Sequence, residues 1–337
     1  MSVWDNELGV YLIAEIGGNH EGDFHKALKL TQLACSSGVD AVKFQIYTGD
    51  SLVSAVEDPQ RNSHFKKFEL TPEQHIAVAK ECTQKGAQYI SSVWDIDAFE
   101  WIDSYMSFYK VGSGDLTAYP FLKRIASTGK PIIISTGLAT LMEVRSAIEY
   151  LVSLDSKYGN KENLALLQCT SMYPIPDTEA NLNVMKTFLT EFEATVGYSD
   201  HTEGTEAVET AVAMGAEIIE IHFTDKKDGQ KFRDHKVSFT TEEVSTLQSK
   251  IIQIKKLKGS FDKKPTPSEI EAEYIESFRR AAYPVRDLEV GHIISKEDLV
   301  ILRPCRGIDA LDYDKVLGKK IIRGISALKP ISWEDLE

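Results

Sequence analysis

The chain has 337 residues, which is enough for one α/β barrel of about 250 residues and a small additional domain. Its formal charge of −13 disfavours nucleic acid and anionic lipid as partners, because a negative surface repels both. The longest apolar runs last only a few residues, whereas a membrane span needs about 20, so we expect no contact with the membrane interior.

The N-terminal residues carry no basic segment followed by an apolar core, so we expect no signal peptide. The four cysteines show no CxxC spacing, and in a chain of this length they are expected to be reduced thiols. Both features predict a cytoplasmic protein.

Short β-rich runs alternate with amphipathic stretches over residues 1–255. Eight strands that alternate with helices predict a (β/α)8 barrel, with an open doubly wound parallel sheet as the alternative. The expected strands are 11–16, 41–45, 88–93, 108–112, 131–135, 164–169, 194–199 and 217–223. The expected helices are 24–36, 72–84, 141–154, 205–214 and 242–256.

The composition changes after the last expected helix. Residues 255–271 are rich in Lys, Gly, Ser and Pro, which is typical of a linker. Beyond them, short β-like pieces are separated by Gly and Pro, and two similar phrases occur, VGHIISKEDLV and ISALKPISWEDLE. We therefore predict a barrel over 1–258, a linker over 259–278 and a small β-rich domain over 279–337.

Polar residues stand at the end of every expected strand. In a barrel the catalytic groups project from the C-terminal strand ends and from the loops that follow them. A purely structural barrel would not need such residues, so we expect an active site there. In chain order they are Glu15, Lys43, Gln45, Ser91, Ser92, Lys110, Ser113, Ser135, Thr170, Ser171, Tyr173, Ser199, Asp200, His201, Glu220 and His222.

Two lysines lie within apolar strand runs. Burying the charges of Lys43 and Lys110 without compensation would be costly, so we expect both to face a cavity that binds an anion. Gly112 and Gly114 would let backbone N–H groups approach the same anion. The competing interpretations are lysines that form salt bridges or snorkel to solvent, and a Schiff-base lysine.

His201 and His222 end strands that are neighbours in a barrel, so their imidazoles could share one divalent ion. Without a thiolate ligand, manganese or magnesium is as compatible with the pair as zinc. Glu15 is interpreted as a sugar anchor or an acid/base, with a salt bridge to an inner lysine as the structural alternative. Asp234 and His235, in a polar loop after the last strand, are candidates for substrate or metal contact, with simple solvation of the loop as the alternative.

A series of motifs in this order resembles the N-acetylneuraminate (sialic acid) synthase family. The tail, with RRAAYPVRDL and LRPCRGI, is similar to the antifreeze-like (SAF) domain that ends those enzymes. The motifs of the barrel are AEIGGNHEGD (14–23), KFQ (43–45), KVGSGD (110–115), STG (135–137), CTSMYP (169–174), GYSDHT (197–202) and EIHFT (220–224).

The resemblance implies a (β/α)8 barrel followed by a SAF domain, paired as a domain-swapped homodimer. It implies condensation of phosphoenolpyruvate with an N-acylated hexosamine aldehyde to give a nonulosonic acid and phosphate. A divalent metal, expected to be manganese with magnesium or cobalt as substitutes, would be bound by His201 and His222. Arg303 would reach the sugar from the partner subunit. Glu15, Tyr173 and Asp234 would be catalytic or contact the sugar, and the residues expected to bind substrate are Lys43, Ser92, Lys110, Ser113, Ser135, Ser171 and Ser199.

Several positions depart from the family pattern, including Ser171, Arg286 and the pair Cys305-Arg306. They leave the sugar open between N-acetylmannosamine and a 2,4-diacetamido-trideoxyhexose, the precursor of legionaminic or pseudaminic acid. Three further functions compete with this one: a synthase of seven- or eight-carbon keto acids, a Schiff-base aldolase, and a non-catalytic protein that binds sugar or ice.

Overall fold

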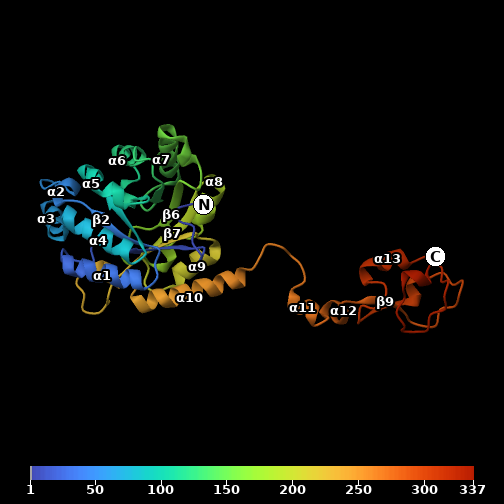
Figure 1. The fold of residues 1–337 in the computed structure, drawn as a ribbon. Coiled ribbons are helices and arrows are strands. Elements are labelled where there is room, and N and C mark those ends of the chain that lie inside the picture. The colour runs from blue at the N-terminus through green and yellow to red at the C-terminus, as the bar shows by residue number, and fades with distance from the viewer. Residues whose placement is uncertain (1) are drawn as a thin grey trace. The chain divides into compact units, whose positions relative to one another are not determined.

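The computed structural model describes residues 2–337. They form two compact units that divide after Gly259. In the first unit, helices surround a set of parallel strands (Figure 1).

The eight strands of the first unit are hydrogen-bonded in the order β3-β2-β1-β8-β7-β6-β5-β4. A parallel bridge between Tyr89 and Met106 joins β3 to the segment just before β4, so the strands nearly close into a ring. This confirms the predicted (β/α)8 barrel. The strands are β1 (Tyr11–Glu15), β2 (Ala41–Ile46), β3 (Gln88–Val93), β4 (Tyr109–Val111), β5 (Ile132–Ser135), β6 (Leu164–Cys169), β7 (Thr195–Asp200) and β8 (Ile218–His222).

Helices α1 (Phe24–Ser36), α4 (Pro72–Gln84) and α7 (Leu141–Leu154) have the bounds that the sequence predicts. Thr71 and Thr140 each accept a hydrogen bond from a backbone N–H of the first turn, which favours helix initiation there. No helix within residues 2–337 combines the length and hydropathy needed to cross a membrane. The other helices of this unit are α2 (Gly49–Leu52), α3 (Pro59–Phe68), α5 (Phe99–Ile102), α6 (Tyr119–Ala126), α8 (Val184–Glu191), α9 (Glu206–Met214) and α10 (Thr241–Lys258).

Alternation along the strands separates the interior of the barrel from the layer beneath the helices. On β1, Leu12 and Ala14 join the core cluster that packs against the helices, whereas Tyr11 and Ile13 join a second cluster inside the barrel. Because strand side chains alternate, Glu15 continues the inner row above Ile13. The same alternation places the polar strand ends of the other strands above apolar inner residues.

The inner apolar cluster closes the N-terminal end of the barrel. Trp4 belongs to it, packs edge-on against Phe108 at 6.0 Å between ring centroids, and donates a 3.1 Å hydrogen bond from Nε1 to Thr195 Oγ1. The cavity above it can therefore fill only from the C-terminal side.

The second unit contains α11 (Pro267–Glu271), α12 (Tyr274–Phe278), α13 (Tyr313–Val316) and an antiparallel pair, β9 (Ala281–Pro284) and β10 (Leu299–Leu302). Two of its helices lie within the predicted linker. Residues 320–322, one of the short β-like pieces that follow the predicted linker, form only isolated bridges.

The two similar phrases in the sequence have the same local structure. Ser295 donates its backbone N–H to Asp298 Oδ2 at 2.9 Å, and Ser332 donates to Asp335 Oδ2 at 2.9 Å. Each Ser–Asp pair forms a capping box at the start of a 3₁₀ turn, so the same local structure occurs twice in the second unit.

Gly197 on β7 is required by close packing inside the barrel. A Cβ atom there would lie 2.2 Å from the Ile218 carbonyl oxygen and 2.6 Å from Leu167 Cδ2. We expect Gly197→Ala to lower the free energy of unfolding by about 1–3 kcal/mol, measured by urea denaturation. Gly159→Ala is the control, because its Cβ would meet Val152 Cγ2 at an ordinary 3.6 Å. Equal stability of the two variants would contradict this account.

Candidate active site

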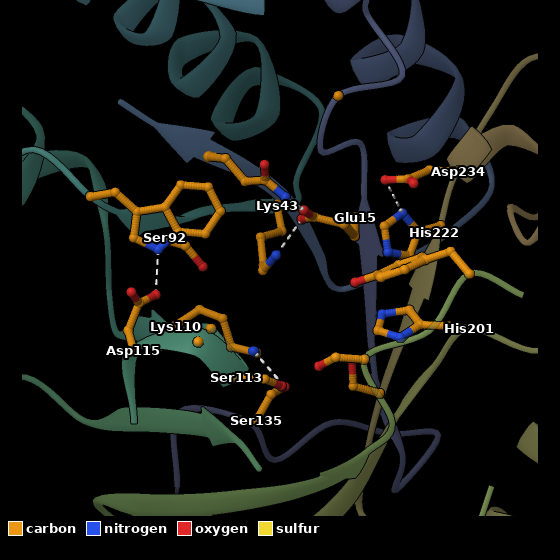
Figure 2. A pocket seen from close by; sticks show the side chains of 18 of the residues that line it. Glu15, Lys43, Ser92, Lys110, Ser113, Asp115, Ser135, His201, His222 and Asp234 are labelled. Atoms are coloured by element: carbon orange, nitrogen blue, oxygen red, sulfur yellow. Dashed lines mark hydrogen bonds and ion pairs between the residues drawn. The ribbon is translucent and has the colours of Figure 1, made fainter. Parts of the chain in front are cut away.

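A cavity of about 790 Å³ opens at the C-terminal ends of the barrel strands. Figure 2 shows the two lysines and the two histidines projecting into it from different strands. Among the predicted site residues, Arg303 lies in the second unit, and Ser91, Thr170, Asp200 and His235 do not line this cavity. The roles of the others stay predictions. Those that line the cavity are Glu15, Lys43, Gln45, Ser92, Lys110, Ser113, Ser135, Ser171, Tyr173, Ser199, His201, Glu220, His222 and Asp234.

Four buried charged side chains form a cluster in this cavity. Lys43 Nζ lies 2.5 Å from Glu15 Oε2, and Gln45 Nε2 donates to Glu15 Oε1 at 2.6 Å. Glu220 Oε2 lies 3.6 Å from Lys110 Nζ and 4.0 Å from Lys43 Nζ. The two cations are therefore balanced by two carboxylates. The structural alternative for Glu15, a salt bridge to an inner lysine, is observed, and it places that carboxylate in the same cavity.

Burial and mutual charge decide the protonation of this cluster. Burial alone would raise the pKa of Glu220, but Lys110 and Lys43 together lower it to about 2. Burial lowers the pKa of Lys110, despite the opposing charge of Glu220. Burial also raises the pKa of Glu15, and the negative charge of Glu220 adds to that effect. Of the two carboxylates, Glu15 is therefore the one that takes up a proton more readily.

Hydroxyl groups line the cavity near Lys110. Lys110 Nζ donates to Ser135 Oγ at 2.7 Å and to the Val111 carbonyl oxygen at 3.1 Å, and Gly137 donates its backbone N–H to Ser113 Oγ at 3.1 Å. A Cβ atom at Gly137 would lie 2.5 Å from Ser171 Oγ, so only glycine leaves room for this group of hydroxyls. An ammonium group beside several hydroxyls is suited to bind a phosphate or carboxylate.

His201 and His222 lie side by side on the wall formed by β7 and β8, with ring centroids 5.2 Å apart. Burial, helped by the neighbouring His222, lowers the pKa of His201 to about 3. Burial, helped by the charge of Lys43, lowers the pKa of His222 to about 3 as well. Both imidazoles are therefore neutral at pH 7, which is the form that binds metal ions.

The imidazole pair fits a divalent ion. His201 Nδ1 donates to the Thr170 carbonyl oxygen at 2.8 Å, which fixes the tautomer and leaves the Nε2 lone pair free. His222 Nδ1 is buried without a hydrogen-bond partner, although Asp234 Oδ2 lies 3.8 Å away. Within residues 2–337 no group of three or more His, Cys, Asp or Glu side chains is arranged to hold a metal. Water and substrate would therefore have to complete the coordination of an ion at this pair.

Tyr173 and Asp234 complete the same side of the cavity. The Tyr173 ring lies 4.0 Å from the His201 ring and 5.6 Å from the His222 ring, between centroids. Arg233 lies over the outer face of Tyr173 at 4.6 Å and pairs with Asp234 Oδ1 at 3.2 Å. Burial raises the pKa of Asp234.

The sequence alone does not assign a role to some of the other residues that line the cavity. Glu220 stood among the polar strand ends, and its period-two spacing from His222 was the signal that both face inward. Trp94 donates from Nε1 to Asp115 Oδ2, and both line the cavity. No spacing rule connects these two positions, although Asp115 belongs to the KVGSGD motif.

Arg303 belongs to the second unit, where its guanidinium lies 5.5 Å from the centroid of the Phe278 ring. Its role in binding the sugar of a partner subunit stays a prediction.

Comparison with known proteins gives a consistent result. A model of the NeuB family matches residues 30–263, and a model of the SAF domain matches residues 279–337. The chain is 36% identical over 342 residues to N,N'-diacetyllegionaminic acid synthase of Legionella pneumophila, covering 97% of this chain and 94% of that protein. It is 36% identical over 324 residues to the protein of the same name from Campylobacter jejuni, covering 91% and 94%.

A solved structure is also similar. The N-acetylneuraminic acid (sialic acid) synthetase of Leptospira borgpetersenii, in complex with citrate, has a TM-score of 0.72 and 29% identity. The match covers 79% of this chain and 90% of that one. The predicted family resemblance is thereby confirmed.

The charge cluster makes a prediction about stability. Lys110→Met should lower the free energy of unfolding by about 3 kcal/mol at pH 7, because Glu220 would be left buried with only the more distant Lys43. The double variant Lys110→Met/Glu220→Gln should regain most of this loss, because the unpaired negative charge is gone. Urea denaturation of both variants measures the effect. A double variant no more stable than Lys110→Met would refute this coupling.

Proposed function

The chain belongs to the NeuB family and ends in a SAF domain, and from this membership we propose that it is a nonulosonic acid synthase. In the proposed reaction, phosphoenolpyruvate, an N-acylated hexosamine aldehyde and water give a nine-carbon 2-keto acid and phosphate. One observation carries the proposal: two buried lysines and two neutral imidazoles line the same cavity.

Phosphoenolpyruvate binds at the lysine end of the cavity. Lys43 and Lys110 supply positive charge, and the hydroxyls of Ser92, Ser113 and Ser135 hydrogen-bond its oxygens. Ser171 and Ser199 also line the cavity and extend this set of hydroxyls. Because the cavity is buried, these charges act more strongly on the developing charge of the reaction than they would in water.

His201 and His222 hold the metal in the proposed site. When bound, a divalent cation, with Mn²⁺ proposed first and Mg²⁺ or Co²⁺ as substitutes, supplies Lewis-acid polarisation of the sugar aldehyde. The hydrogen bond from His201 Nδ1 to Thr170 keeps that imidazole oriented toward the cavity.

C3 of phosphoenolpyruvate would attack the aldehyde carbon, and the aldehyde oxygen would take up a proton to become a hydroxyl. Water would add to C2 and supply the new keto oxygen, the C2–O bond to phosphate would break, and the second proton of the water would leave with phosphate. Glu15, whose carboxylate takes up a proton more readily than that of Glu220, lines the cavity and would contact the added water or a sugar hydroxyl. Tyr173 and Asp234 position the sugar beside the two histidines.

The proposal includes an assembly. In a domain-swapped homodimer, Arg303 of the partner subunit would reach the acylamino group of the sugar. The guanidinium offers several N–H donors for an amide oxygen.

The reaction is tested by incubating the purified chain with phosphoenolpyruvate and a panel of aldehydes, including N-acetylmannosamine and a 2,4-diacetamido-trideoxyhexose. Phosphate release and the mass of the product are measured. His201→Ala should lower phosphate release on the order of 100-fold or more, because an electrostatic stabilisation of the transition state is lost. A chelator should abolish the activity of the unmodified chain, and Mn²⁺ should restore it.

His25→Ala is the matched control, because His25 is exposed on α1 and does not line the cavity. The proposal fails if His201→Ala retains the activity of this control in the presence of a chelator. It also fails if borohydride traps a substrate on a lysine, which would indicate Schiff-base chemistry.

A further inference from the structure

The outer part of the cavity has a different chemistry from its base. Six aromatic side chains line it in a continuous series, which we call the aromatic arc. Successive ring centroids along the series are 5.7, 5.2, 5.5, 4.5 and 5.1 Å apart. The members, in order, are Trp94, Tyr47, Phe65, His64, Phe68 and Phe232.

The arc is held in place by its surroundings. Asn62, buried on α3, donates from Nδ2 to the carbonyl oxygens of Gly49 and Val53 at 2.9 and 2.8 Å. This fixes α3, which carries three of the rings, against the segment that follows β2. On the other side, a Cβ at Gly18 would lie 2.7 Å from the Phe232 ring, so glycine is required for that ring to pack. The aromatic surface is therefore present before a ligand binds.

Two cations, Arg61 and Arg233, line the cavity near the arc. The Arg61 guanidinium lies 5.6 Å from the Phe65 ring centroid, over its face. Arg233 pairs with Asp234 and lies over Tyr173. Only Arg233 of these two pairs with a carboxylate, so the arc offers several ring faces and a single cation, Arg61, without one, which favours methyl groups over a phosphate. A hydroxyl placed against it without a hydrogen-bond partner would lose affinity.

We propose that the aromatic arc binds the end of the sugar remote from the aldehyde and selects a diacylamino deoxy sugar over one with free hydroxyls or a phosphate there. This rests on the proposed function, which places the aldehyde beside the two histidines. The acetyl methyl and the deoxy methyl of a 2,4-diacetamido-2,4,6-trideoxyhexose then meet the rings. N-Acetylmannosamine instead presents two hydroxyls to the same surface.

The test measures binding separately from turnover. The alditols of three sugars are titrated calorimetrically into the full chain: the 2,4-diacetamido-2,4,6-trideoxyhexose, N-acetylmannosamine and N-acetylmannosamine 6-phosphate. Alditols lack the aldehyde, so their affinities do not depend on the proposed reaction. We expect the diacetamido alditol to bind tightest.

Phe68→Ala should weaken the diacetamido alditol about 10-fold and change the other two by less than about 3-fold, because only the first places apolar groups on the rings. Phe192→Ala is the matched control, since Phe192 is a half-buried ring that does not line the cavity. If Phe68→Ala does not fold, Phe68→Leu keeps an apolar but smaller surface, and about half of the effect on a logarithmic scale is expected.

Tighter binding of N-acetylmannosamine or its phosphate by the unmodified chain would overturn the inference, as would equal losses for all three alditols in Phe68→Ala. Turnover with phosphoenolpyruvate is measured on the same preparations. Selective binding without phosphate release would leave the arc's role intact and refute the proposed function. Phosphate release without selective binding would support the proposed function and overturn the inference about the aromatic arc.

Discussion

The balance of two cations and two carboxylates inside the barrel is the constraint on which the site depends. Lys43, Lys110, Glu15 and Glu220 are all nearly inaccessible to solvent, and burying any one of them alone would cost several kcal/mol. The short distances between opposite charges offset the cost of burying them. The barrel sets these distances, because the strand register places Glu15 beside Lys43 on neighbouring strands. An anion that enters this cluster exchanges its hydration for charges that are already desolvated. The same packing that stabilises the cluster therefore holds the two lysines in the positions that the proposed phosphoenolpyruvate site requires.

Much of the site could be predicted from the sequence because strand periodicity carries the information. Once the strands are located, every second residue faces inward, and the inward residues near the strand ends include Glu15, Lys43, Lys110, Ser135 and His222. Their chemistry at strand ends is enough to predict a polar cavity, which the structure shows, and its affinity for an anion and a metal stays a prediction. The arrangement of charge within the cavity could not be predicted, because the contact of Glu220 with both lysines depends on barrel curvature and side-chain direction.

The aromatic arc could not be predicted for a different reason. Helix α3 has a mostly exposed and polar sequence, so no amphipathic pattern indicated it. Its rings meet Phe232, which comes from a loop far along the chain and follows no periodic pattern. Similarly, the two short helices within the predicted linker could not be predicted. The Pro and Lys content of this segment is typical of a linker, although Thr266 forms a capping box at the start of α11. Contacts between loops are set by the fold as a whole, and single-sequence patterns describe only local order.

The inner apolar cluster that contains Trp4 closes the N-terminal end of the barrel, and this has a kinetic consequence for the proposed reaction. A cavity that is closed at one end has a single opening, so the ligand that binds deepest has to bind first. In the proposed reaction, phosphoenolpyruvate at the two lysines would have to bind before the sugar, because the apolar cluster that contains Trp4 closes the N-terminal end of the barrel. The products would leave in the reverse order, and the product bound deepest in the cavity would leave last.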